Sequence, residues 1–187
     1  MSKHLLLAAM AAFSLALPAL TPAAAQEKTV QVGGAPMYPS KNIIQNAINS
    51  KDHTTLVAAV KAAGLVDTLQ GAGPFTVFAP TNAAFGKLPQ GTVDNLLKPE
   101  NKATLTKVLT YHVVPGRMTA TSLMKAVKDG GGTAKFKTVA GDEITIKQDG
   151  TKLWVWDAKG NSATVTVADV LQSNGVIHVV NTVLLPM

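Results

Sequence analysis

The stretch PFTVFAPTNAAF, residues 74–85, decides the fold more than any other part of this chain. Its residues 75–79 are short, apolar and rich in β-forming types on both alternating faces, which is typical of a sheet strand covered on both sides. Pro80 ends that strand, and Thr81 is a residue type that caps a helix start. The stretch therefore predicts a buried strand that runs directly into a short helix.

Segments before this strand have helical periodicity, and those after it increasingly have strand periodicity. We expect helices around residues 43–48, 54–63, 92–97, 100–111 and 121–128, the second of them ended by Gly64 in a left-handed conformation. Apolar and polar residues alternate over 143–147, Asp149-Gly150 predicts a hairpin turn, and strands follow at 153–156 and 175–185. This order predicts an α+β fold.

The first 25 residues have the pattern of an export signal. A short basic start precedes an apolar, Ala-rich run, and Ala23-Ala24-Ala25 suits cleavage before Gln26. A retained membrane anchor is the alternative, although Ser14 and Pro18 interrupt a run that is short for a span. The sequence has 0 Cys, so neither a lipid anchor on cysteine nor a disulfide is available. We expect a secreted or periplasmic protein of bacterial type.

Removing the 25 signal residues from the 187-residue chain leaves 162, which suits one domain with one substantial core. We interpret 26–37 as a flexible lead-in and 38–187 as the domain, a monomer without a membrane span. Only Lys3 is lost from 17 basic and 11 acidic residues, so the formal charge becomes +5. The scattered lysines form either a solvated basic face or a weak attraction for anionic glycans or membranes. No nucleic-acid recognition motif is present.

The polar residues do not form a recognisable catalytic or metal-binding pattern. His112 continues the apolar stripe of Leu105, Val108 and Leu109, so we expect it to be buried and hydrogen-bonded. No two of the histidines at 53, 112 and 178 have the spacing of helical metal ligands, and no serine lies in a G-x-S-x-G elbow. We therefore predict no enzyme activity, no metal and no cofactor.

Two tryptophans, Trp154 and Trp156, share one face of a strand, opposite Leu153 and Val155. If Leu153 and Val155 face the core, the tryptophans are partly exposed. Their rings then either pack against side chains of neighbouring strands or form a stacking platform for sugars or a partner.

Three stretches together resemble the fasciclin domain. The first is residues 75–85, the second is the Tyr111-His112 pair within YHVVPG, and the third is SNGVIHVVNTVLLP at 173–186. Ala168-Asp169-Val170 is similar to the family's Asp-Ile element, with valine in place of isoleucine. The resemblance implies several N-terminal helices packed on a β-wedge of two small sheets.

The resemblance also implies a function in adhesion. Animal members are extracellular adhesion modules, and their Tyr-His and Asp-Ile regions have been linked to integrin binding. Carried over, these regions correspond to Tyr111, His112, Asp169 and Val170, which also have structural duties at a helix end and a turn.

The leading hypothesis is therefore a non-catalytic adhesion module that binds a cell-surface or matrix protein or polysaccharide. One alternative is a periplasmic carrier for a small apolar or lipid ligand, held between helices and wedge in a deep apolar pocket. Another is an unrecognised hydrolase that depends on His112.

Overall fold

The fold was analysed in a computed structural model that describes residues 28–187, so the expected signal at 1–25 lies outside the described residues. The helices are α1 (Ile43–Ala47), α2 (Thr54–Ala63), α3 (Val66–Gln70), α4 (Asn82–Gly86), α5 (Thr92–Leu96), α6 (Lys102–Tyr111) and α7 (Ala120–Asp129), with 3-10 turns η1 (Lys51–His53) and η2 (Pro99–Asn101). The strands are β1 (Val30–Val32), β2 (Ala35–Met37), β3 (Phe75–Pro80), β4 (Val113–Pro115), β5 (Thr133–Lys137), β6 (Glu143–Asp149), β7 (Lys152–Trp156), β8 (Ser162–Gln172) and β9 (Gly175–Val180). The predicted α+β class is confirmed.

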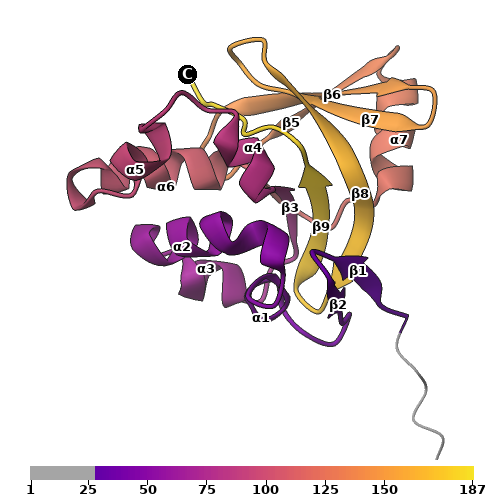
Figure 1. Cartoon of the computed structure of the whole chain (residues 1–187). Coiled ribbons are helices and arrows are strands. Elements are labelled where there is room, and N and C mark those ends of the chain that lie inside the picture. The colour runs from indigo at the N-terminus through magenta and orange to yellow at the C-terminus, as the bar shows by residue number, and fades with distance from the viewer. Residues whose placement is uncertain (1–27) are drawn as a thin grey trace, which may run out of the picture.

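One long strand, β8, joins two sheets into a wedge. The strand order is β4-β3-β9-β8-β7-β6-β5, and the β3–β9 pair is parallel. One stretch of β8 pairs with β7 at residues 162–164, and the rest pairs with β9 between 165 and 172, with register shifts on either side of Val167. In Figure 1 β8 curves along the whole height of the molecule. The expected wedge of two small sheets therefore consists of β4-β3-β9 and β7-β6-β5, which meet along β8.

Helices α1 to α6 lie on one side of the wedge and α7 lies on the other (Figure 1). Local chemistry sets their ends as the sequence predicts. The Thr81 side chain accepts a hydrogen bond from the Ala84 amide at the start of α4, and Gly64 ends α2 at a φ of 72°. The Leu65 amide then bonds back to the Val60 carbonyl, which closes the last turn.

The two sides of the wedge enclose two apolar clusters. The first, here called the helical core, lies between α1–α6 and the β3–β9 pair and includes Leu56, Val60, Val77, Leu105, Leu109, Val170 and Ile177. The second, here called the hairpin core, lies between α7 and the β5–β8 sheet and includes Phe78, Tyr111, Leu123, Ile144, Ile146, Leu153, Val155 and Leu184. Alternate residues of β3 thus enter different cores, which explains why that strand is apolar on both faces.

The flexible lead-in expected over residues 26–37 is wrong for residues 30–37, which form the β1–β2 hairpin. Gly33 and Gly34 occupy the turn with positive φ, and Val32 and Met37 are buried in the helical core. The Lys51 amide also donates to the Gly33 carbonyl at 3.2 Å. Gly33-Gly34 is a local turn signal, but strands of three residues are too short to show a period, so the hairpin is ordered largely by these tertiary contacts.

No helix within residues 28–187 combines the length and the apolar character needed to cross a membrane.

Candidate functional site

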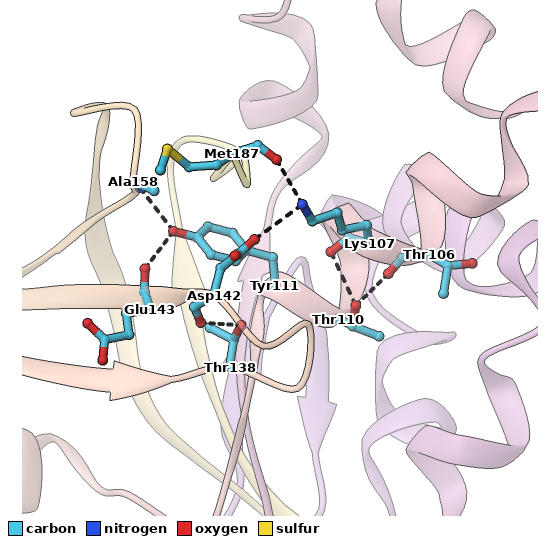
Figure 2. A network of polar contacts seen from close by, with 9 residues as sticks. All are labelled: Thr106, Lys107, Thr110, Tyr111, Thr138, Asp142, Glu143, Ala158 and Met187. Atoms are coloured by element: carbon cyan, nitrogen blue, oxygen red, sulfur yellow. Dashed lines mark hydrogen bonds and ion pairs between the residues drawn. The ribbon is translucent and has the colours of Figure 1, made fainter.

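Tyr111 occupies the last position of α6 and has none of its surface exposed. Its hydroxyl donates to the Glu143 carbonyl of β6 at 2.9 Å and accepts from the Ala158 amide, in the turn after β7, at 3.0 Å. Figure 2 shows this hydroxyl between the backbones of Glu143 and Ala158. Burial is the main cause that raises the pKa of Tyr111. The side chain therefore fastens α6 to the hairpin sheet.

A second set of polar contacts lies beside this junction (Figure 2). Lys107 Nζ lies 3.4 Å from Asp142 Oδ2 and donates to the carbonyl of Met187 at 2.8 Å. The hydroxyl of Thr138 donates to the Asp142 backbone carbonyl at 2.7 Å. The end of α6, the loop before β6 and the C-terminus are therefore held at one place.

His112 caps α6 from within the protein, with 2% of its surface exposed. The Leu184 amide donates to its Nε2 at 3.0 Å, so the ring proton is on Nδ1, which donates to the Val108 carbonyl at 2.8 Å. Burial lowers the pKa of His112 to about 4. The imidazole is neutral at neutral pH, and both nitrogens are already engaged. The expected buried, hydrogen-bonded histidine is confirmed.

Asp169 and Val170 lie in β8 at the irregular part of its pairing. Asp169 has a φ of 57°, a left-handed conformation that Asp tolerates better than most residues. Its Oδ1 accepts from the Ala120 amide at 2.7 Å, where a carboxylate also favours the positive end of α7. Val170 is 1% exposed and belongs to the helical core.

His178 takes part in a second junction, which joins the start of α7 to β8 and β9. The Asp169 amide donates to His178 Nδ1 at 3.4 Å, and His178 Nε2 donates to the Met118 carbonyl at 2.8 Å. The ring also stacks on Phe78, with centroids 5.6 Å apart. Burial lowers the pKa of His178. Asp169 and His178 therefore fasten the start of α7 to β8 and β9.

The four residues suggested by the family pattern thus form two structural junctions and not one surface patch. Tyr111 and His112 hold α6, β6 and the C-terminal segment, whereas Asp169 holds α7. Tyr111, His112 and Val170 have at most 2% of their surface exposed, so in this conformation they cannot contact a partner. Only Asp169 among the four is partly exposed.

The helical core contains an apolar cavity of about 40 Å³ that two of the four residues line. His112 and Val170 line it together with Phe78, Val77, Leu56 and Ile177. His53 also lines it, 3% exposed, and shares a 2.8 Å hydrogen bond between its Nδ1 and Ser50 Oγ. Its Nε2 has no hydrogen-bond partner within residues 28–187.

Burial lowers the pKa of His53. The nearby Ala79 carbonyl raises this pKa in part, although it does not form a hydrogen bond with His53 Nε2. His53 ends the η1 turn directly before α2, and no feature of the sequence separates it from an exposed loop histidine. The Ser50–His53 contact is not a catalytic triad, because a triad needs an acid on the second nitrogen. Within residues 28–187, no group of three or more His, Cys, Asp or Glu is placed to hold a metal ion.

Comparisons with known proteins agree with this architecture. Protein sll1483 of Synechocystis is 45% identical over 180 residues, which cover 95% of this chain and 93% of that protein. The cell surface glycolipoprotein MPB83 of Mycobacterium bovis is 36% identical over 145 residues, covering 75% of this chain and 58% of that protein.

Among solved structures, a FAS1 domain pair from the insect cell adhesion molecule Fasciclin I superposes with a TM-score of 0.70 at 17% identity. It covers 85% of this chain, which spans 58% of that one, and at this identity it shows the fold alone. The Fasciclin domain family model matches residues 51–186. The chain therefore belongs to the Fasciclin domain family.

Proposed function

We propose that this protein is an exported, monomeric, non-catalytic adhesion module that binds a cell-surface or matrix ligand in the periplasm or outside the cell. Family membership over residues 51–186 is the observation that carries the proposal. The similarity to a mycobacterial cell surface glycolipoprotein supports a surface location.

The state of His112 and His178 supports a function without catalysis. Burial lowers the pKa of His53, His112 and His178, so all three are neutral at neutral pH. Both ring nitrogens of His112 and of His178 are used in hydrogen bonds that join secondary-structure elements. A general base needs a nitrogen free to accept a substrate proton, and these two residues offer none.

Within this proposal, Tyr111, His112, Asp169 and Val170 contribute to binding by holding the surface in shape. Tyr111, His112 and Asp169 each hydrogen-bond a segment that ends at the surface: the turn at Ala158, the C-terminal residues and the start of α7. Val170 has no such bond and holds β8 by packing in the helical core. Loss of one anchor would therefore weaken adhesion by loosening a loop and not by removing a contact.

The test is adhesion of the purified protein to cells and to matrix polysaccharide over a salt series, beside a Tyr111→Ala/His112→Ala variant. Circular dichroism and thermal melting establish whether the variant remains folded at the assay temperature. Salt-resistant adhesion by the natural protein would support the proposal. Adhesion that disappears at moderate salt in both proteins would show that it comes only from the positive net charge. No adhesion at all would contradict the proposal.

The cavity favours a second candidate function, the binding of a small apolar ligand between helices and wedge. Its walls are almost entirely apolar, and the free His53 Nε2 offers one polar contact. A volume of about 40 Å³ admits only a very small molecule unless the helices move apart. Native mass spectrometry of protein purified from its own host tests this function. A retained extra mass lost on His53→Leu would support it, and an unliganded mass would contradict it.

A further inference from the structure

Both tryptophans of the chain lie on the outer face of the sheet formed by β5, β6, β7 and β8, which we call the tryptophan face. Opposite residues on neighbouring strands share a face, so the register defines two parallel rows across the four strands. One row consists of Thr133, Lys147, Trp154 and Thr164, and the other consists of Lys135, Thr145, Trp156 and Ser162. Each row therefore holds one cation, one indole ring and two hydroxyl groups.

The opposite face explains why the rings are presented outward. Leu153 and Val155 are buried in the hairpin core, as the sequence predicts, so Trp154 and Trp156 must face away from it. Both rings are half-buried, whereas Lys135 and Lys147 are exposed. Lys147 Nζ lies 4.6 Å from the centre of the Trp156 ring, which holds that ring in place by a cation–π contact.

One hollow lies beside the two rings on this face, and a second opens next to Trp154, where the pairing of β7 with β8 ends. The first, of about 280 Å³, is lined by Lys147, Gln148, Asp149, Trp154 and Trp156. The second, of about 610 Å³, is lined by Trp154, Thr164 and Thr166 from this face and also by Leu153, Val165 and Met124 from the hairpin-core side. Trp154 therefore borders both hollows, one on the face and one at the opening between β7 and β8.

Charge on the face favours an anionic ligand. The register places Lys135, Lys137, Lys147 and Lys152 here against two carboxylates, Glu143 and Asp149. Lys135 is 3.9 Å from Glu143, which neutralises part of that charge. The face thus carries four lysines against two carboxylates, and Lys147 lies against the Trp156 ring.

We propose that the tryptophan face binds an anionic polysaccharide, a partner class that rests on the proposed adhesion function. The flat C–H faces of sugar rings stack on the indoles, the hydroxyls of Thr164 and Ser162 bond sugar hydroxyls, and the ammonium groups pair with sugar carboxylates. The ligand lies across the strands along the row of Lys147, Trp154 and Thr164, with one sugar on Trp154 and the next in the hollow lined by Lys147 and Trp156.

Intrinsic fluorescence tests this directly, because Trp154 and Trp156 are the chain's 2 tryptophans and both are on the face. The purified protein is titrated with alginate, a polyuronate, at about 0.15 M salt, where exposed charge interactions are already strongly screened. We expect a saturable change in tryptophan emission with alginate and none with neutral dextran. Equal responses to both, or no response, would overturn the proposal. So would a stronger response to phosphatidylglycerol vesicles, which would assign the face to membranes.

Matched charge variants separate a site from net charge. Lys147→Gln and Lys61→Gln each remove one exposed lysine, but Lys61 is on α2 in the helical half of the molecule. We expect affinity for alginate to fall by at least about fivefold for Lys147→Gln and by less than about twofold for Lys61→Gln. Equal losses would overturn the proposal. Trp154→Thr retains Trp156 as a reporter and should lose at least about tenfold.

The outcomes distinguish this proposal from the proposed function. If the natural protein adheres to cells while alginate leaves its emission unchanged, adhesion stands and the tryptophan face is not its site. If alginate binds at the face while no adhesion is found, polysaccharide recognition stands and the adhesion role fails.

Discussion

The helical core and the hairpin core differ in how completely they are filled. The helical core encloses a cavity of about 40 Å³ and a histidine nitrogen without a partner within residues 28–187. In the hairpin core, Ile144, Ile146 and Val155 have none of their surface exposed, and the Tyr111 hydroxyl makes two hydrogen bonds. The helical core therefore has room for an added methylene group, whereas the proposed binding face lies over the hairpin core.

Tyr111 and His112, neighbours in sequence, stand at the border between the two cores. Tyr111 belongs to the hairpin core, whereas His112 lines the cavity of the helical core. Alternation of Phe78 and Val77 on β3 divides that strand between the cores in the same way. Substitutions on either side of this border therefore separate the contributions of the two cores.

The largest expected effect is on acid stability and comes from His112. Its pKa is about 4 in the folded protein, against an ordinary histidine value of 6.5, so the unfolded state binds more protons between these values. The stabilisation is fully present above about pH 6.5, is lost as the pH falls toward 4, and amounts to about 3 kcal/mol. Urea unfolding at pH 7, 5 and 4 measures it.

His112→Gln is the control for this prediction, because it removes the titrating group from the border. The free energy of unfolding of the variant should depend less steeply on pH across this window, with the remaining slope due to other groups, including His53 and His178. An unchanged slope would show that His112 does not titrate in this way.

Tyr111→Phe should destabilise the hairpin side by about 1–3 kcal/mol, because it leaves the Glu143 carbonyl and the Ala158 amide without a partner. Tyr38→Phe removes the same atom from the chain's other tyrosine, which is half-buried, and should change stability by less than about 0.5 kcal/mol. Chemical denaturation compares the two, and equal losses would show that the Tyr111 junction is not special.

Adding one methylene group to each core should change the free energy of unfolding in opposite directions. Val77→Ile extends into the cavity and should stabilise the protein by up to about 0.8 kcal/mol. Val155→Ile crowds the hairpin core and should destabilise it by about 1–3 kcal/mol. Both positions are buried in strands, so β propensity is matched. Thermal melting of both variants measures these changes. A lower melting temperature for both would show that the two cores do not differ in how they accept an added methylene group.

The smallest effect is expected at the surface of the border. Lys107→Ala removes the Asp142 ion pair and the contact with the Met187 carbonyl, and should cost at most about 1 kcal/mol, less at high salt. Lys61→Ala is a helix-surface control without this pair. A salt-independent loss well above this value would mean that the C-terminus is held more strongly than its contacts indicate.

Local chemistry made much of this fold predictable. The covered strand β3, the Thr81 cap, the Gly64 helix end and the hairpin at Gly150 all follow from residues close in sequence. The burial of His112 was also predictable, because a helical stripe places it on the core face.

Features that depend on distant residues could not be predicted. Asp169 supports the start of α7 through the Ala120 amide, 49 positions away, and nothing beside either residue indicates this contact. The unpartnered nitrogen of His53 likewise depends on the shape of a cavity built from several elements. The sequence placed the two tryptophans on one strand face, but the lysines and hydroxyls that complete the rows are fixed only by strand register.

The most direct test is adhesion to a polyuronate-coated surface by three folded proteins: the natural chain, Trp154→Thr/Trp156→Thr and Tyr111→Phe. The measurement is made well below the melting temperature of each protein. If the tryptophan face binds and the Tyr111 junction only supports it, the double variant loses adhesion and Tyr111→Phe retains most of it. Adhesion retained without the tryptophans but lost in Tyr111→Phe would contradict a binding role for the tryptophan face.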